Sequence, residues 1–309
     1  MSDGGAPSTY AGLRAERRGG PDGRPPLVLL HGLSYDRHRW GPLLRELEAV
    51  DPAREVLVVD LPGHGQSPSL DRHGLDDVAA VVHRAVTEAG LTRPVVVGHS
   101  IGGAIATAYA AAHPARGVVN IDQPLRVGGF AGMLQRSGDV LRGPGYGTLW
   151  DGLLGRMGID GLPPEAHALA RPDAVPPKEL LLSYWDELLT TPPATLDERN
   201  AGRLARIASQ GTPYHYVTGA EPDPEYRAWL SRALPDVTIS VLPGSGHFPH
   251  LAHPAEVARL LSWGGGEAGA GEPAWGASSA TRRSRTSAPA SAAPAATVSA
   301  RRWMVPVEE

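Results

Sequence analysis

Short apolar runs alternate with longer segments of helical periodicity along most of this chain. The runs are rich in valine, leucine and isoleucine and have the length of buried strands: 27–30, 56–60, 95–98, 118–122, 214–218 and 237–242. Apolar positions at helical spacing predict helices over 40–50, 75–89, 101–113, 226–234 and 254–263. Strands that alternate with helices indicate a mostly parallel sheet with helices on both faces. The pattern therefore predicts an α/β fold.

One interval interrupts the alternation. Between the fourth and fifth predicted strands, residues 125–211 carry aromatic and leucine-rich pieces of helical pattern, such as 179–189. The interval is too long for a structureless loop in a compact domain. We therefore predict a helical cap, residues 125–211, inserted into a core made of 27–124 and 212–263. Such a cap would lie over the ends of the strands.

The two ends of the chain differ from this middle part in composition. Residues 1–26 are rich in glycine, arginine and proline, and we expect this N-terminal segment to be partly flexible. Residues 264–309 consist largely of Gly, Ala, Ser, Pro and Arg. Because so few apolar side chains cannot offset the entropy of ordering the backbone, we expect a disordered low-complexity tail.

Composition narrows the classes of function. The chain has 309 residues, 41% apolar composition, no cysteine and a formal net charge of −4 at pH 7. It can bury a large core, and it lacks the basic surface of a nucleic-acid-binding protein. No apolar run approaches the ~20 residues that span a bilayer, and the N-terminus lacks the apolar stretch of a secretory signal. We therefore expect a cytoplasmic protein without disulfides whose partner is a small molecule, and the sequence leaves the oligomeric state open.

A nucleophile motif follows the third predicted strand. Residues 95–103, V-V-V-G-H-S-I-G-G, form an apolar run that ends in G-x-S-x-G and leads into an alanine-rich helix. A strand, a sharp turn and a helix are the context of a nucleophile elbow, with Ser100 at its apex. Gly98 and Gly102 fit because strand and helix approach too closely there for a Cβ. A serine hydroxyl is inert at neutral pH, so the motif also requires a histidine base, an acid and an oxyanion hole.

Three further motifs occur in a fixed order around this elbow. H-G-L at 31–33 follows the first strand, D-L-P-G-H-G-Q-S at 60–67 follows the second, and G-H-F-P-H at 246–250 follows the last. Together with the elbow, this order resembles proteins of the α/β-hydrolase fold, of the esterase, lipase and carbon–carbon hydrolase type. The resemblance covers 27–263 and implies a serine hydrolase that uses no cofactor or metal.

The resemblance implies an oxyanion hole and a base. In that family the H-G-x turn and the residue after the nucleophile each donate a backbone N–H, which implies Leu33 and Ile101 here. The family places its base in the loop after the last strand, which implies His247. Other histidines are expected in other roles: His99 beneath the elbow, His64 in a structural turn, and His250 and His253 at a helix cap or on the surface.

The position of the candidate acid departs from the family pattern. The family usually places it after the strand 214–218 as G-x-x-D, but Pro222 stands at that spacing and Asp223 comes one residue late. Some members place the acid after the preceding strand, where this chain has Asp122. Aspartate among prolines in a turn is common for local reasons, whereas a carboxylate at the end of an apolar strand needs a partner. Both Asp122 and Asp223 are therefore candidates, with a slight preference for Asp122.

The predicted cap would roof an apolar pocket. Candidate pocket residues come from the cap interval and from the motif loops: His31, Ser34, Phe130, Met133, Trp150, Tyr184, Trp185 and Phe248. Ser100 would attack a carbonyl, His247 would carry its proton to the leaving group, and water would release the acyl-enzyme. We therefore expect a carboxylesterase that acts on a small or medium hydrophobic ester.

Two other functions fit the same scaffold. A ligand receptor or regulatory protein could keep the triad with little turnover, and a carbon–carbon hydrolase or perhydrolase would use the triad with another leaving group. A serine at the elbow argues against dehalogenase and epoxide hydrolase chemistry, which in relatives needs a carboxylate nucleophile to form an alkyl ester. Whether turnover depends on Ser100 separates these alternatives.

Overall fold

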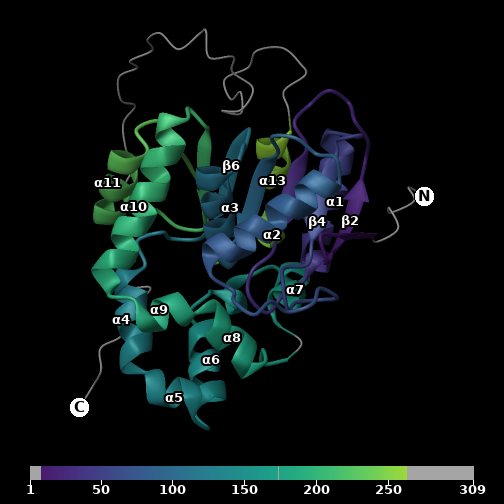
Figure 1. Ribbon diagram of the computed structural model, residues 1–309. Coiled ribbons are helices and arrows are strands. Elements are labelled where there is room, and N and C mark those ends of the chain that lie inside the picture. Colours follow the sequence, from purple (N-terminus) through teal and green to yellow (C-terminus); the bar gives the residue numbers. More distant parts are fainter. Residues whose placement is uncertain (1–7, 173, 263–309) are drawn as a thin grey trace, which may run out of the picture.

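The computed structural model describes residues 8–172 and 174–262, with an eight-stranded sheet at their centre (Figure 1). The strands lie in the order β1-β2-β4-β3-β5-β6-β7-β8. The six strands from β3 to β8 run parallel, so the predicted mostly parallel α/β sheet is confirmed. Strand bounds are β1 Ser8–Tyr10, β2 Leu13–Arg18, β3 Leu27–Leu30, β4 Val56–Val59, β5 Val95–His99, β6 Gly117–Ile121, β7 Tyr214–Thr218 and β8 Thr238–Val241.

Burial on both faces explains why the central strands read as continuous apolar runs. All four residues of β3 are buried, and alternate side chains enter different clusters. Val28 and Leu30 pack in the cluster that contains α2 (Leu75–Glu88) and α3 (Ile101–Ala112). Leu27 and Leu29 pack in the cluster that contains α1 (Gly41–Val50) and α13 (Pro254–Leu261). A strand of this kind has no polar face, as expected for a parallel sheet covered on both sides.

The N-terminal pair β1 and β2 lies in the segment that we expected to be partly flexible. β2 pairs antiparallel with β4, and its Leu13 and Ala15 are buried in the core. The sequence of β2, L-R-A-E-R-R, has only two apolar positions, which is too short a pattern to predict a strand. Its pairing partner β4 is also distant in sequence. Residues 1–7 and the predicted tail 264–309 lie outside the described residues.

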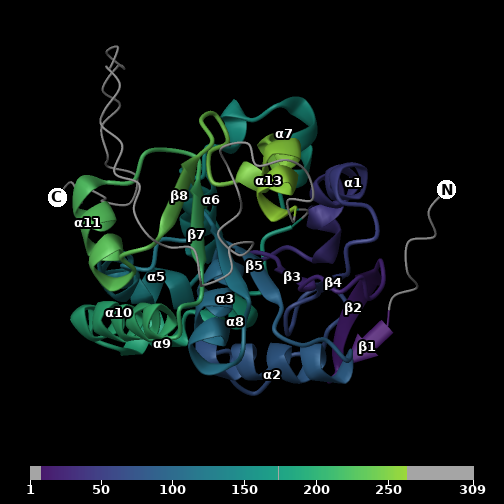
Figure 2. The same ribbon diagram turned by 90° about the horizontal axis from the view of Figure 1, so that it is seen from above.

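Helices cover both faces of the sheet (Figure 2). α1 and α13 pack together on one face, while α2, α3 and α10 cover the other. Each presents an apolar stripe to the strands, as amphipathic helices do. The bounds of the core helices are η1 Arg37–Trp40, α1 Gly41–Val50, α2 Leu75–Glu88, α3 Ile101–Ala112, α11 Pro224–Ala233, α12 Pro249–Ala252 and α13 Pro254–Leu261.

Helices also fill the described part of the interval between β6 and β7. Figure 1 shows α4, α5, α6, α8 and α9 gathered below the sheet, and α10 runs from this group back along the core, whereas α7 packs against α12. Leu204 and Ile207 of α10 pack in the same buried cluster as α3, so the second half of α10 belongs to the core rather than to a cap. The bounds are α4 Gly128–Arg136, α5 Gly138–Arg142, α6 Tyr146–Leu154, η2 Ile159–Gly161, α7 Pro164–Ala170, α8 Lys178–Tyr184, α9 Asp186–Thr190 and α10 Pro193–Ser209.

A buried ion pair fixes the loop after β4. The carboxylate of Asp60 is fully buried and lies 2.5 Å from Arg37 Nη1. Its oxygens also accept hydrogen bonds from the backbone N–H of Arg37 (2.8 Å) and of Gln66 (3.0 Å). The D-L-P-G-H-G-Q-S motif is therefore held against η1 by a charged group that has several donors around it.

We expect Asp60→Asn to destabilise the fold by about 3–5 kcal/mol, because Arg37 would keep its buried charge without a counter-ion. Urea unfolding of the variant and the wild type measures this difference. The control is Glu165→Gln, which removes the carboxylate of an exposed pair with Arg45 and should cost less than about 1 kcal/mol. Equal losses in the two variants would contradict the role of the buried pair.

Candidate active site

Ser100 lies between β5 and α3 in a strained backbone conformation, with φ 53° and ψ −130°. Close packing holds the strain in place. A Cβ on Gly98 would lie 2.0 Å from Gly102 O, and a Cβ on Gly102 would lie 2.2 Å from Leu30 O. The backbone N–H of Ser100 donates to Ile121 O at the end of β6 (3.0 Å). The turn brings Ser100 to the wall of a cavity at the carboxyl ends of the strands.

Asp122 follows β6 directly and lies beside His247. Its Oδ2 is 2.8 Å from His247 Nδ1, and both side chains are at most 10% exposed. The other oxygen, Oδ1, accepts hydrogen bonds from Thr218 Oγ1 (2.6 Å) and from the backbone N–H of Gly219 (3.3 Å). Neither donor was predicted from the sequence, although Thr218 is the polar end of an apolar strand. Together they fix the orientation of the carboxylate toward the imidazole.

Asp223 lies at the start of α11 and has a local role there. Its Oδ1 accepts hydrogen bonds from the backbone N–H of Glu225 (2.8 Å) and of Tyr226 (3.4 Å), which is an N-terminal helix cap. Of the two candidate acids, the structure therefore brings Asp122 to His247 and places Asp223 at a helix terminus. The sequence could not decide between them because the decision depends on which strand ends face the histidine loop.

The backbone of His247 is held from two sides. Its N–H donates to Met157 O in the segment after α6 (2.8 Å), and its C=O accepts a hydrogen bond from His99 Nε2 (2.8 Å). Gly246, at φ 55°, permits this approach, because a Cβ there would lie 2.6 Å from Met157 O. The position of His247 therefore depends both on the cap and on the residue that precedes Ser100.

Leu33 and Ile101, the expected oxyanion donors, line the same cavity as Ser100 and His247. Within residues 8–172 and 174–262, the backbone N–H groups of Leu33 and Ile101 bond to no acceptor. Over the same residues no hydrogen bond joins Ser100 to His247. Such contacts are often long before a substrate binds and tighten in the complex.

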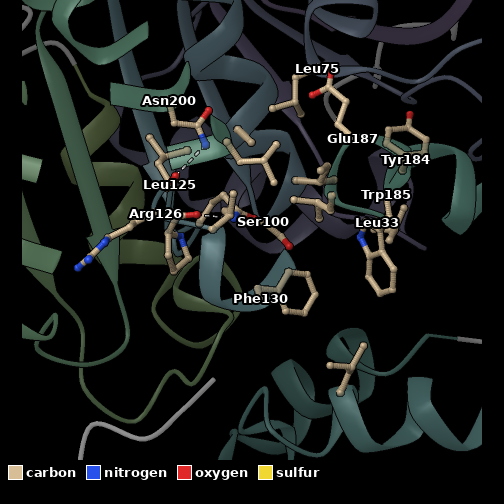
Figure 3. A pocket seen from close by; sticks show the side chains of 18 of the residues that line it. Leu33, Leu75, Ser100, Leu125, Arg126, Phe130, Tyr184, Trp185, Glu187 and Asn200 are labelled. Carbon is tan, nitrogen blue, oxygen red and sulfur yellow. Dashed lines mark hydrogen bonds between the residues drawn. The ribbon is translucent and has the colours of Figure 1, made fainter. Parts of the chain in front are cut away.

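The cavity has a volume of about 250 Å³ and a largely apolar wall. Five residues predicted for the pocket line it, namely Ser34, Phe130, Trp150, Tyr184 and Trp185. Figure 3 shows Phe130, Tyr184 and Trp185 around the space that Leu33 and Ser100 also border. The core therefore supplies the floor of the cavity, and helices α4, α6, α8 and the turn after α8 supply much of its roof.

The other three predicted pocket residues do not line the cavity. The ring of His31 is buried, and its Nε2 accepts a hydrogen bond from the backbone N–H of Leu61 (2.9 Å). Phe248 is fully buried with its ring edge-on to Tyr35, at a centroid distance of 6.1 Å. Met133 belongs to α4 and packs against the apolar core. Phe248 and Met133 are thus packing residues, and the spacing of apolar residues cannot distinguish packing from a ligand contact.

Several histidines of the core have lowered pKa values. Burial lowers the pKa of His64 and of His250 to about 3, and the pKa of His99 lies well below its ordinary value for the same reason. The expectation that His250 lies at a helix cap or on the surface was wrong. This ring is 2% exposed and lies between His99 and Trp40, at centroid distances of 4.3 and 4.8 Å.

Within residues 8–172 and 174–262, no group of three or more histidine, cysteine or carboxylate side chains is arranged to hold a metal ion. No helix in these ranges is long and apolar enough to cross a membrane.

Comparison with known proteins gives one family. The sequence profile described as "Alpha/beta hydrolase family" matches residues 27–260. A 2-succinyl-6-hydroxy-2,4-cyclohexadiene-1-carboxylate synthase from Enterobacter sp. (strain 638) is 27% identical over 261 residues, which cover 81% of this chain and 95% of that protein.

Solved structures of low sequence identity share the fold. Haloalkane dehalogenase DbeA from Bradyrhizobium elkani superposes with a TM-score of 0.61 at 21% identity, over 83% of this chain and 95% of the other. An enzyme described as degrading N-acyl homoserine lactones superposes with a TM-score of 0.57 at 21% identity, over 83% and 98%. These likenesses show a common architecture and no common substrate.

The buried histidines predict that the fold loses stability as the pH falls below 6.5. The folded-state pKa is about 3 for His64 and His250 and about 4 for His215, against an ordinary value of 6.5. Above pH 6.5 neither state takes up these protons. Between pH 6.5 and about 4 only the unfolded chain takes them up, so each residue costs roughly 1.4 kcal/mol per pH unit. Urea unfolding at pH 7.5 and pH 5 measures the loss.

His250→Phe tests one of these residues, because phenylalanine keeps a ring beside Trp40 and takes up no proton. From pH 7.5 to pH 5 the variant should lose about 2 kcal/mol less stability than the wild type. The difference in free energy of unfolding between the variant and the wild type at pH 7.5 measures any change in packing. An equal loss in both proteins would show that His250 does not contribute.

Proposed function

Since the chain belongs to the alpha/beta hydrolase family, we propose that it is a cofactor-independent serine hydrolase, in the simplest case a carboxylesterase for a small or medium hydrophobic ester. One observation carries the proposal. The 2.8 Å contact between Asp122 and His247 lies next to a cavity that both His247 and the strained Ser100 line. A nucleophile, a base and an acid that orients the base are the parts that serine acyl transfer requires.

Acylation is the first half of the proposed reaction. Ser100 Oγ attacks the ester carbonyl carbon while His247 Nε2 takes its proton, and the Nδ1–H of His247 stays bonded to Asp122. The carbonyl oxygen becomes an oxyanion that accepts hydrogen bonds from the N–H groups of Leu33 and Ile101. Each such donor is worth on the order of 3 kcal/mol in the transition state. The imidazolium then gives its proton to the leaving alcohol.

Deacylation reverses the roles of the same groups. Water enters the place of the alcohol, His247 takes its proton, and the hydroxide attacks the acyl-enzyme. Collapse of the second oxyanion returns the proton to Ser100 and releases the carboxylic acid. Asp122 stabilises the imidazolium in both halves, and Thr218 and Gly219 hold its carboxylate in the orientation that selects the Nδ1–H tautomer.

The serine nucleophile argues against a dehalogenase function for this chain, although dehalogenases share its fold. Displacement of a halide by a serine oxygen would leave an alkyl ether on Ser100, and water does not hydrolyse an ether under mild conditions. A carboxylate nucleophile gives an ester, which water can hydrolyse. The serine therefore favours substrates that already contain an acyl group.

A second candidate is a reaction at a carbon–carbon bond, and one observation favours it. The Enterobacter relative, which covers most of this chain, is named for the synthesis of a cyclohexadiene carboxylate. The same base and oxyanion donors would stabilise a carbanion or enolate next to a carbonyl. Hydrolysis of simple esters that depends on Ser100 would favour the esterase over this alternative.

Ser100→Ala and His247→Ala should each lower kcat for 4-nitrophenyl butanoate by about 10³-fold or more, because neither variant can form or activate the nucleophile. The rate is measured as the release of 4-nitrophenolate over time. Circular dichroism and urea unfolding serve as controls that both variants remain folded. Retention of the wild-type rate in either variant would exclude the proposed mechanism.

The acid is tested by a matched pair of substitutions. Asp122→Asn should lower kcat by about 10³–10⁴-fold, because an amide N–H facing Nδ1 favours the tautomer that cannot accept the proton of Ser100. Asp223→Asn removes the same charge from a helix cap and should leave kcat within about two-fold while it lowers stability by ~1 kcal/mol. The reverse result would assign the acid to Asp223.

A further inference from the structure

His64 is a buried titratable residue that the proposed mechanism does not use. It lies in the loop after β4 and is 5% exposed. Its Nδ1 is 3.0 Å from Pro62 O. Because a carbonyl oxygen can only accept, Nδ1 carries the hydrogen and Nε2 keeps its lone pair. Burial lowers the pKa of His64 to about 3, which keeps this neutral tautomer at neutral pH.

The lone pair of His64 accepts a hydrogen bond from the turn that carries a proposed oxyanion donor. The backbone N–H of Ser34 donates to His64 Nε2 (3.2 Å). Ser34 directly follows Leu33, whose own N–H bonds to no acceptor within residues 8–172 and 174–262. One imidazole therefore links the D-L-P-G-H-G-Q-S loop to the turn after β3, although 30 residues separate the two partners in sequence.

This turn, residues 32–35, has a conformation that serine disfavours. The backbone N–H of Tyr35 donates to Gly32 O (3.3 Å), which closes a turn of four residues. Leu33 and Ser34 stand at its two central positions, and φ is negative at Leu33 and 67° at Ser34. These signs are those of a type II turn, whose third position is usually glycine or asparagine. A serine there favours type I, in which the peptide between Leu33 and Ser34 is turned over.

The bond to His64 opposes that rotation. With the peptide turned over, the N–H of Ser34 would leave Nε2, and the carbonyl oxygen of Leu33 would turn toward the same lone pair. A buried acceptor without a donor is costly, so neutral His64 favours the type II turn. Because Leu33 belongs both to this peptide and to the one that bears the proposed oxyanion donor, the turn type affects where its N–H points.

The ring of His64 is held in place by several contacts. Pro62 O also accepts a hydrogen bond from the hydroxyl of Tyr184 (2.9 Å). The rings of His31 and Tyr184 contact the imidazole edge-on, each at a centroid distance of 5.2 Å. The buried carboxylate of Asp60 anchors the same loop. The acceptor nitrogen therefore has a fixed position from which it can set the conformation of the turn 32–35.

We propose that His64 is a positioning residue for the oxyanion hole. Its Nε2 holds the N–H of Ser34, keeps the turn 32–35 in type II, and thereby aims the N–H of Leu33 at the carbonyl oxygen of the substrate. The inference rests on the proposed hydrolase function for its kinetic test. The loss of His64 Nε2 should weaken the transition state, in which this oxygen carries charge, more than it weakens binding of the ester.

Two substitutions separate the two nitrogen atoms of His64. His64→Asn keeps a donor near the position of Nδ1 and removes the acceptor at Nε2, whereas His64→Gln can place its amide oxygen near the position of Nε2. His64→Asn should lower kcat for 4-nitrophenyl butanoate about 10-fold or more while KM stays within about two-fold, and His64→Gln should recover most of the wild-type kcat. His113→Asn, at the far end of α3 from Ser100, is the matched control and should change neither value.

A trifluoromethyl ketone reports on the oxyanion hole directly. Ser100 Oγ adds to the carbonyl carbon of 1,1,1-trifluoro-2-hexanone, His247 takes the serine proton, and the ketone oxygen becomes an oxyanion. The inhibition constant should rise in His64→Asn by about the factor by which kcat/KM falls, and it should return toward the wild-type value in His64→Gln. A loss of kcat/KM with an unchanged inhibition constant would reject the role of His64 in the oxyanion hole.

Ser34→Gly tests the turn itself, because glycine adopts φ 67° without strain. In a protein that carries Ser34→Gly, the further change His64→Asn should lower kcat by less than about three-fold, since the type II turn no longer needs the bond to His64. An equal loss of kcat from His64→Asn with Ser34 and with Ser34→Gly would show that His64 does not act through the turn, and would overturn the proposal.

Hydrogen exchange needs no substrate and separates this inference from the hydrolase function. Mass spectrometry at pH 7.5 follows the backbone amides of residues 31–36 in the wild type, His64→Asn and His64→Gln. Exchange in this segment should be faster in His64→Asn than in the other two proteins, because the amide of Ser34 loses its acceptor. Equal exchange in all three would overturn the proposal. If the wild type hydrolyses no ester, the hydrolase proposal fails, whereas faster exchange in His64→Asn still supports the hold of His64 on the turn.

Discussion

The parallel register at the carboxyl ends of β5, β6 and β7 is the constraint on which the site depends. The backbone N–H of Ser100 bonds to the last residue of β6, and the backbone N–H of Asp122 bonds to Val217 near the end of β7. Each residue that follows a strand is thereby tied to the neighbouring strand. Because adjacent strands lie ~4.8 Å apart, two backbone hydrogen bonds set where the serine and the carboxylate stand. A shift of one residue in the pairing of these strands would turn the side chains of Ser100 and Asp122 to the other face of the sheet.

Local patterns allowed most of this site to be predicted from the sequence. The elbow around Ser100 needs small residues at two fixed positions, and Gly98 and Gly102 supply them within five residues. Properties that depend on distant partners were harder to predict. Asp122 and Asp223 both follow apolar strands, and only the strand order brings one of them to His247. His250 lies beside a helix start in the sequence, yet it is buried between Trp40 of η1 and His99 of the elbow.

The helical segment between β6 and β7 holds the backbone of His247 and also forms part of the cavity wall. Met157 accepts the backbone N–H of His247, and the same residue lines the cavity. His99 holds the carbonyl of the same peptide from the core side. Part of the cavity wall and one anchor of the His247 backbone therefore lie in the same segment. Under the proposed function, a substitution that reshapes this part of the wall also acts on the alignment of His247.

The course of α10 joins the helices inserted between β6 and β7 to the core. The helix begins among the cap helices and ends packed on α3, without an interruption over Pro193–Ser209. A continuous helix resists bending, and Asn200 ties its middle to Leu125 at the other connection between cap and core. The two segments that connect the inserted helices to the core are therefore bonded to each other, and both border the cavity.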